Sequence, residues 1–198
     1  MATDDVREAV LDAARAAFHT KGYARTTVKG VAAMAGVAPS VVSKYYENKE
    51  AMFAAAMKLP FDPSHAVPEL LQPGLDGMGE RLVRATFEVF GDEETRADLL
   101  ALFQAGASAG RATSTLREFI EESIVDRLAG FVGIPDARMR AALVSSHLVG
   151  LGITRYIVRV EPLASAPEEQ VVRIYAPLVQ ELLDPARPLP KARVRAPQ

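Results

Sequence analysis

The chain has 198 residues, 49% of them hydrophobic and 24% charged, which is typical of a globular protein. It contains no cysteine, which excludes disulfide bonds and thiolate metal ligands. The formal net charge of −2 argues against a protein that binds polyanions with its whole surface. The two parts of the chain differ, because residues 1–58 carry 8 Lys/Arg and 6 Asp/Glu, whereas residues 59–198 carry 15 Lys/Arg and 19 Asp/Glu. A slightly basic part, which we call the head, therefore precedes an acidic part, the body.

Apolar residues recur at spacings of three and four along nearly the whole chain, which predicts an all-α fold. In the head, this spacing predicts four helices, at about 5–21, 27–35, 39–46 and 49–59. Asp5, Thr27 and Asn48 are suitable N-cap residues for three of them. Gly22 is expected to end the first helix, and Gly36 to form the turn between the second and third.

A proline-rich stretch, LPFDPSHAVPELLQPG at residues 59–74, is expected to connect head and body, because proline cannot continue a helix. Five helices are predicted in the body, at about 75–90, 93–107, 112–131, 136–160 and 167–183. The basic, proline-rich end PARPLPKARVRAPQ is expected to be disordered. The predicted division is a head at 1–58, a body at 59–184 and a tail at 185–198.

The second and third helices are joined by a glycine turn, which matches a helix-turn-helix at about 27–46. In such a unit the second helix enters the major groove of DNA. Val42 and Tyr46 would anchor residues 39–46 to the head, while the small Ser40 and Ser43 would let the backbone approach DNA. Spacing alone leaves open the alternative that this face is simply a solvated surface of a helical bundle, or that it binds protein.

Three further features of this region suit contact with DNA. Val41 can touch a thymine methyl group, and Lys44 and Tyr45 can reach phosphates. Thr27 lies at a helix N-terminus, where free N–H groups favour a phosphate. Lys49 lies in the first turn of the next helix, where the helix dipole disfavours a cation unless an anion is nearby.

Residues 26–57, TTVKGVAAMAGVAPSVVSKYYENKEAMFAAAM, resemble the signature of the tetracycline-repressor (TetR) family of bacterial transcription regulators, and the upstream AARAAFHTKGYARTT resembles that family's first helix. The likeness covers about residues 5–58, and the body only through length and helical content. It implies a homodimeric regulator, most often a repressor, that binds double-stranded DNA at an inverted repeat. It implies no catalytic residue, metal or cofactor. The residues predicted to face DNA are Thr27, Lys29, Pro39, Ser40, Val41, Ser43, Lys44, Tyr45 and Lys49.

The sequence departs from the family pattern at three positions. Ala38 stands where a serine often caps the third helix, which forfeits about 1 kcal/mol of capping. Val41 and Ser43 stand where threonine and tyrosine are frequent. Base preference therefore cannot be transferred from a relative.

The last two predicted helices have features of a dimer interface. The last helix carries two apolar stripes, so it is expected to pack on both sides. One stripe is Val171, Tyr175, Leu178 and Leu182, and the other is Val172, Val179 and Leu183. Small residues recur at spacings of four in the preceding helix. The resemblance implies that these helices form a four-helix interface between two chains, and the alternative is a buried monomer core. The predicted interface residues are Ala142, Ser146, Gly150, Tyr175, Leu178 and Leu182.

The resemblance also implies a cavity in the body for a small-molecule effector of unknown identity, apolar or amphipathic. Phe87, Phe103, Gln104 and His147 are the predicted ligand-binding residues, with the polar pair orienting the ligand. Aromatic residues at helical spacing are more often plain core. His147, on an otherwise apolar helix, is alternatively a hydrogen-bonded core histidine.

A competing motif is GASAG at residues 106–110, which matches G-x-S-x-G. Ser108, Asp126 or Asp136, and His147 follow in the order of an α/β-hydrolase triad. That site requires a strand before the serine, whereas TRADLLALFQA has helical periodicity, so an enzyme is not expected. His19, His65 and His147 are not at metal-ligand spacing.

The location of the protein is also predicted. The acidic start MATDDVRE lacks the apolar stretch of a signal peptide. The most apolar helical segment, around 141–154, is too short and too polar to span a bilayer. We therefore expect a cytoplasmic protein without a membrane partner.

Overall fold

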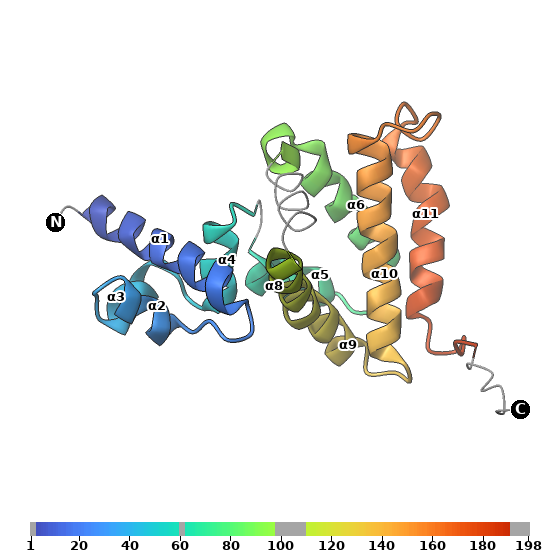
Figure 1. Ribbon diagram of the computed structural model, residues 1–198. Coiled ribbons are helices and arrows are strands. Elements are labelled where there is room, and N and C mark those ends of the chain that lie inside the picture. Colours follow the sequence, from blue (N-terminus) through green and yellow to red (C-terminus); the bar gives the residue numbers. More distant parts are fainter. Residues whose placement is uncertain (1–2, 60–61, 98–109, 191–198) are drawn as a thin grey trace, which may run out of the picture.

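The computed structural model describes residues 3–59, 62–97 and 110–190. Helices are the regular secondary structure of these residues, and no strand occurs among them, so the predicted all-α fold is confirmed. Figure 1 shows the first four helices grouped at one end of the molecule and the long α10 and α11 side by side at the other. Among the described residues, none of the helices has the length and hydropathy that a bilayer crossing requires.

The head contains α1 (Thr3–Lys21), α2 (Val28–Met34), α3 (Pro39–Tyr45) and α4 (Lys49–Ala56). Two predicted caps are confirmed: Thr27 Oγ1 accepts a hydrogen bond from Gly30 N at 3.1 Å, and Asn48 Oδ1 accepts one from Ala51 N at 2.8 Å. Gly36 has φ +67°, as its turn requires. The predicted cap at Asp5 is wrong, because α1 begins at Thr3 and contains Asp5.

The connection between head and body contains a helix that the sequence analysis did not expect. In the proline-rich stretch, α5 spans Pro63–Leu71. Asp62 caps it by accepting hydrogen bonds from Ser64 N at 2.9 Å and Ser64 Oγ at 2.7 Å. Pro63 occupies the first turn, where a missing N–H costs nothing, and Pro68 is tolerated inside the helix. The stretch still connects head and body, but its prolines do not prevent a helix within it.

The body continues with α6 (Met78–Gly91), α8 (Gly110–Ile120), α9 (Asp126–Val132), α10 (Ala137–Gly152) and α11 (Glu168–Leu183). The helix predicted at 93–107 is described only to residue 97. Two predicted helices are interrupted: the π-helical turn η1 (Glu121–Val125) joins α8 to α9, and η2 (Ile153–Ile157) follows α10. A π-turn keeps nearly helical periodicity, so the apolar pattern did not reveal it.

Two hydrophobic cores hold these helices. The body core lies mainly between α6, α10 and α11 and includes Val83, Val144 and Val179. Glycines allow close approach there, since a Cβ on Gly79 would clash with the backbone of α11 and one on Gly152 with the Phe90 ring. The head core surrounds Phe18, Tyr23 and Phe53, and it also includes Phe119 from α8 of the body.

Candidate functional site

The α3 helix presents its predicted outer face to solvent. Val42 and Tyr46 are buried and anchor the helix, as expected. Pro39 occupies the first turn, and Ala38 provides no side-chain cap, so the helix begins without the hydroxyl that a serine would supply. Exposed or partly exposed on α3 are Pro39, Ser40, Val41, Ser43, Lys44 and Tyr45.

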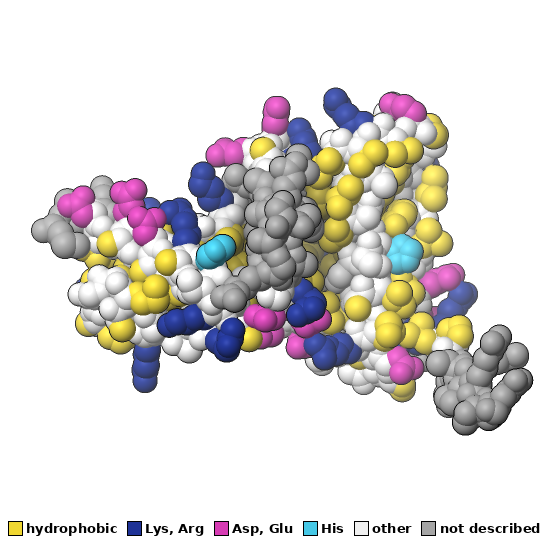
Figure 2. All heavy atoms as spheres, viewed as in Figure 1, with side chains coloured by type: hydrophobic (Ala, Val, Ile, Leu, Met, Phe, Trp, Pro, Cys, Tyr) yellow, Lys and Arg dark blue, Asp and Glu magenta, His cyan; other side chains and the backbone are white. Residues whose placement is uncertain are grey.

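The α2 helix packs against α3 and adds two exposed residues, Thr27 and Lys29, to this end of the head. Figure 2 shows basic side chains along one edge of the head. We call the exposed residues of α2 and α3 named here the α3 face. This arrangement can present small side chains to base edges and a lysine to phosphates.

The structure does not bring Lys49 to the α3 face. Its ammonium lies at the junction of head and body, 3.2 Å from Glu122 Oε2 and 3.3 Å from the carbonyl oxygen of Tyr23. The same Nζ lies 3.9 Å from the centroid of the Tyr23 ring. The anion that offsets the helix dipole at Lys49 is therefore a carboxylate of the body in this structure.

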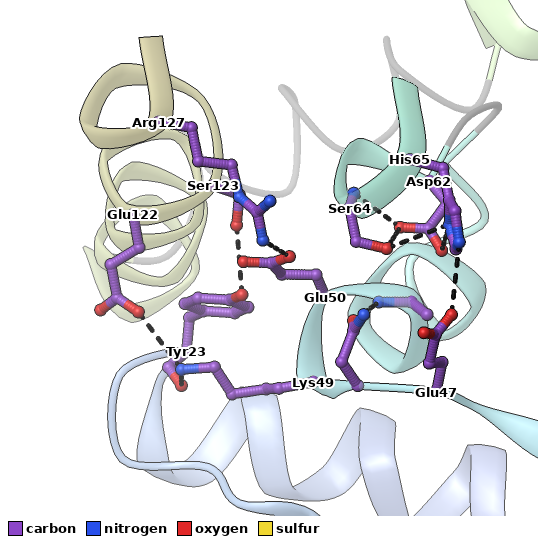
Figure 3. A network of polar contacts seen from close by, with 12 residues as sticks. Tyr23, Glu47, Lys49, Glu50, Asp62, Ser64, His65, Glu122, Ser123 and Arg127 are labelled. Atoms are coloured by element: carbon purple, nitrogen blue, oxygen red, sulfur yellow. Dashed lines mark hydrogen bonds and ion pairs between the residues drawn. The ribbon is translucent and has the colours of Figure 1, made fainter. Parts of the chain in front are cut away.

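Several contacts that the sequence analysis missed form this junction (Figure 3). The Tyr23 hydroxyl hydrogen-bonds Ser123 Oγ at 3.2 Å, with both residues buried. Glu50, next to Lys49, forms an ion pair with Arg127. Burial raises the pKa of Tyr23 to about 12, so this phenol stays neutral. No periodicity or spacing signals these pairs, because their partners are 73 to 100 residues apart.

The predicted dimer residues lie largely on an exposed face of α10 and α11. Ala142 and Ser146 are exposed, and space is open beyond Gly150. Apolar side chains on this face are also open: the exposed fractions are 59% for Met139, 62% for Ile174 and 49% for Leu178. Tyr175 and Leu182 are half-buried. Hydrophobic side chains gather on the surface over α10 and α11 in Figure 2. We call this set the α10–α11 face.

Of the four predicted ligand-binding residues, the structure describes Phe87 and His147, and these two lie in different surroundings. His147 is exposed, so it is no core histidine; its Nδ1 lies 3.1 Å from the Tyr175 hydroxyl, among the residues of the α10–α11 face. Phe87 is buried and lines a hollow of about 190 Å³ with Arg84, Glu88 and Glu168. Phe103, Gln104 and the GASAG serine, Ser108, lie outside the described residues.

Both the head and the body of the chain match the models of known protein families. Residues 10–56 match the model of the N-terminal domain of bacterial regulatory proteins of the tetR family. Residues 76–183 match the tetracyclin repressor-like C-terminal domain. None of the curated proteins compared with the chain matches it significantly.

Solved structures include similar proteins. A TetR-family regulator from Streptomyces coelicolor is 35% identical, with 90% of this chain and 94% of that chain covered and a TM-score of 0.46. NalD of Pseudomonas aeruginosa, the secondary repressor of the MexAB-OprM multidrug efflux pump, is 16% identical, with 90% and 95% covered and a TM-score of 0.50, a likeness of fold alone. The two domain matches show that this chain belongs to the TetR family of helix-turn-helix DNA-binding transcription regulators.

Proposed function

We propose that this protein is a ligand-responsive repressor of the cytoplasm that binds an inverted-repeat operator as a homodimer and leaves it when a small apolar or amphipathic effector binds. The observation that carries the proposal is the α3 face. Its short side chains and single lysine are open to solvent while Val42 and Tyr46 hold the helix to the head. Residues 1–58 act as the DNA-binding domain and residues 59–184 as the effector and dimerisation domain.

The α10–α11 face supports the homodimer. Large apolar side chains exposed next to small ones favour burial against another protein surface. A second copy, related by a twofold axis, brings α10 and α11 of both chains together in a four-helix interface. Two heads so related read two half-sites of an inverted repeat.

The effector is the least defined part of the proposal. A ligand can release DNA only if it binds the state that does not bind DNA more tightly. The buried Phe87 beside its hollow suits an apolar group, and the charged rim of Arg84, Glu88 and Glu168 suits a polar one. Phe87, Phe103 and Gln104 remain the proposed effector contacts, whereas His147, exposed beside Tyr175, belongs to the α10–α11 face. No catalytic step is part of this function.

DNA selection tests the proposal directly. The wild-type protein should select duplexes with an inverted repeat from random-sequence DNA. Lys44→Ala should weaken binding to every selected duplex and lower the slope of log affinity against log salt by about one. Val41→Ala and Ser43→Ala should change base preference instead. If all three variants kept wild-type affinity and preference, α3 would not be the recognition helix, and a protein-binding role for the head would replace it.

A further inference from the structure

Arg25 lies in the short segment that joins α1 to α2, beside the α3 face. The chain is held on both sides of it: the Tyr23 ring is buried in the head core, and the buried Thr26 donates a hydrogen bond from Oγ1 to the carbonyl oxygen of Gly22 at 2.7 Å. Arg25 itself is exposed. Its side chain therefore leaves the head from a fixed point.

The Arg25 side chain is also fixed partway along its length. Its Nε donates a hydrogen bond to the carbonyl oxygen of Lys21, the last residue of α1, at 2.9 Å. Within the described part of the chain, the terminal amino groups Nη1 and Nη2 have no hydrogen-bond or ion-pair partner. The carboxylate of Glu118, which reaches this segment from the body, accepts a hydrogen bond from Ala24 N at 2.9 Å and forms no ion pair with Arg25. Arg25 thus presents an oriented, unpaired guanidinium to solvent.

The place where Arg25 emerges is the border of the α3 face. Thr27, two residues later, belongs to that face and is exposed, whereas Thr26 between them is buried. The Cα atoms of residues two apart are separated by about 7 Å at most. Lys29 and Lys44 of the α3 face also form no ion pair with any described residue. Arg25 therefore extends the unpaired positive charge of the α3 face.

A guanidinium with free terminal amino groups suits a phosphate, since two parallel N–H donors meet two phosphate oxygens. We propose that Arg25 binds a phosphate of the DNA backbone at the border of the α3 face and so helps to set the position of α3 in the major groove. Such a contact positions the protein without reading bases. Because the chain and Nε are already held, little side-chain freedom is lost on binding. This inference rests on the proposed function.

The experiment measures dissociation constants at several salt concentrations for two duplexes: the one that the wild-type protein selects from random-sequence DNA, and a shuffled duplex of the same composition. Arg25→Gln should weaken binding to both by a similar factor, about tenfold, the effect of losing one charge-assisted hydrogen bond. The slope of log affinity against log salt should fall by about one per bound head. Thermal unfolding of each variant checks that its fold is intact.

Arg25→Lys separates a phosphate contact from a structural role. Lysine keeps the charge but lacks the planar fork. This variant should keep the wild-type salt slope and recover part of the affinity. If the hydrogen bond to the end of α1 were the whole role of Arg25, Arg25→Gln and Arg25→Lys would weaken binding equally and leave the slope unchanged, which would overturn the phosphate contact.

Lys58→Gln is the matched control, because Lys58 is also exposed and forms no ion pair with a described residue, but lies beyond the end of α4. It should keep the wild-type slope and affinity. An equal fall in slope for Lys58→Gln would show a general effect of charge on the head and overturn the phosphate contact. A slope that Lys44→Ala lowers and Arg25→Gln leaves unchanged would overturn the role of Arg25 alone. A wild-type protein that selects no duplex would overturn the proposed function as well.

Discussion

At the scale of single residues, Tyr23 connects the two parts of the molecule. Its ring lies in the head core beside Phe18 and Phe53, with centroids 5.9 Å and 5.1 Å away. Its hydroxyl hydrogen-bonds Ser123 in the body, and its carbonyl oxygen accepts a hydrogen bond from Lys49. A phenol in this position must remain neutral, because an anion would be buried without a cation on its oxygen.

The raised pKa of Tyr23 gives a pH-dependent stability. Burial raises it from 10.0 to about 12 in the folded protein, so the unfolded chain loses this proton first as pH rises. The contribution of Tyr23 to the free energy of unfolding is fully present below pH 10 and is lost as the pH rises from 10 to 12. At pH 11 the loss is on the order of 1 kcal/mol. Urea unfolding at pH 9 and pH 11 should show a smaller fall in unfolding free energy for Tyr23→Phe than for the wild type.

Ser123→Ala is the control for this prediction, because it removes the hydrogen bond but leaves the phenol buried. Since burial is the main cause of the raised pKa, Ser123→Ala should keep the wild-type dependence on pH. An equal fall for wild type and Tyr23→Phe would show that Tyr23 titrates alike in both states.

At the scale of elements, α11 shows how one helix can have two apolar faces. Val172, Val179 and Leu183 are buried against the body, as one predicted stripe required. The other stripe, Val171, Tyr175, Leu178 and Leu182, ranges from buried to exposed, with Leu178 open. A helix that faces only its own core has one such stripe. The open part of the second stripe is the part that the proposed dimer would bury.

Leu178→Glu should place a charge in the proposed dimer interface. Burial of an unpaired carboxylate is costly, so the dimer dissociation constant should rise about tenfold or more. Sedimentation at micromolar concentration measures it. Met34→Glu is the matched control, because Met34 on α2 is 47% exposed, close to the 49% of Leu178, and should leave the dimer intact. A wild-type monomer at this concentration would refute the interface.

At the scale of the whole molecule, head and body share a core. Phe119 of α8 is 2% exposed and lies 4.4 Å from the Phe53 ring and 5.3 Å from the Tyr23 ring, between centroids. Glu118, beside it, accepts a hydrogen bond from Ala24 N at 2.9 Å. The hydrophobic core of the head therefore includes Phe119, which lies 61 positions beyond the predicted boundary of the head at residue 58. Head and body are therefore in direct contact through buried side chains and not only through the connecting segment.

Phe119→Ala should destabilise the protein by about 3–5 kcal/mol, the usual effect of removing a buried phenylalanine. Phe131→Ala is the control, because Phe131 on α9 is 41% exposed and should change the unfolding free energy by about 0.5 kcal/mol or less. Urea unfolding followed by helical circular dichroism measures both. Similar losses for the two variants would show that Phe119 adds little to the head core.

The sequence by itself determined the features that depend on neighbours a few residues away. The caps at Thr27 and Asn48, the turn at Gly36 and the inward Val42 and Tyr46 were all predicted, because a cap or a helical face involves residues within one or two turns. The family signature lies in the same short-range pattern, so the helix-turn-helix and the regulator class could be recognised before the structure.

Only the tertiary structure decided what lies beside these elements. Lys49 has the composition and position of a phosphate contact, yet its ammonium meets Glu122, 73 residues later. His147 was expected in a core or a pocket and is exposed beside Tyr175. The π-turn η1 and the Phe119 of the head core leave no local pattern either. Helical periodicity gives the face on which a residue lies, whereas its partner depends on how distant segments pack, and packing is decided by the whole chain at once.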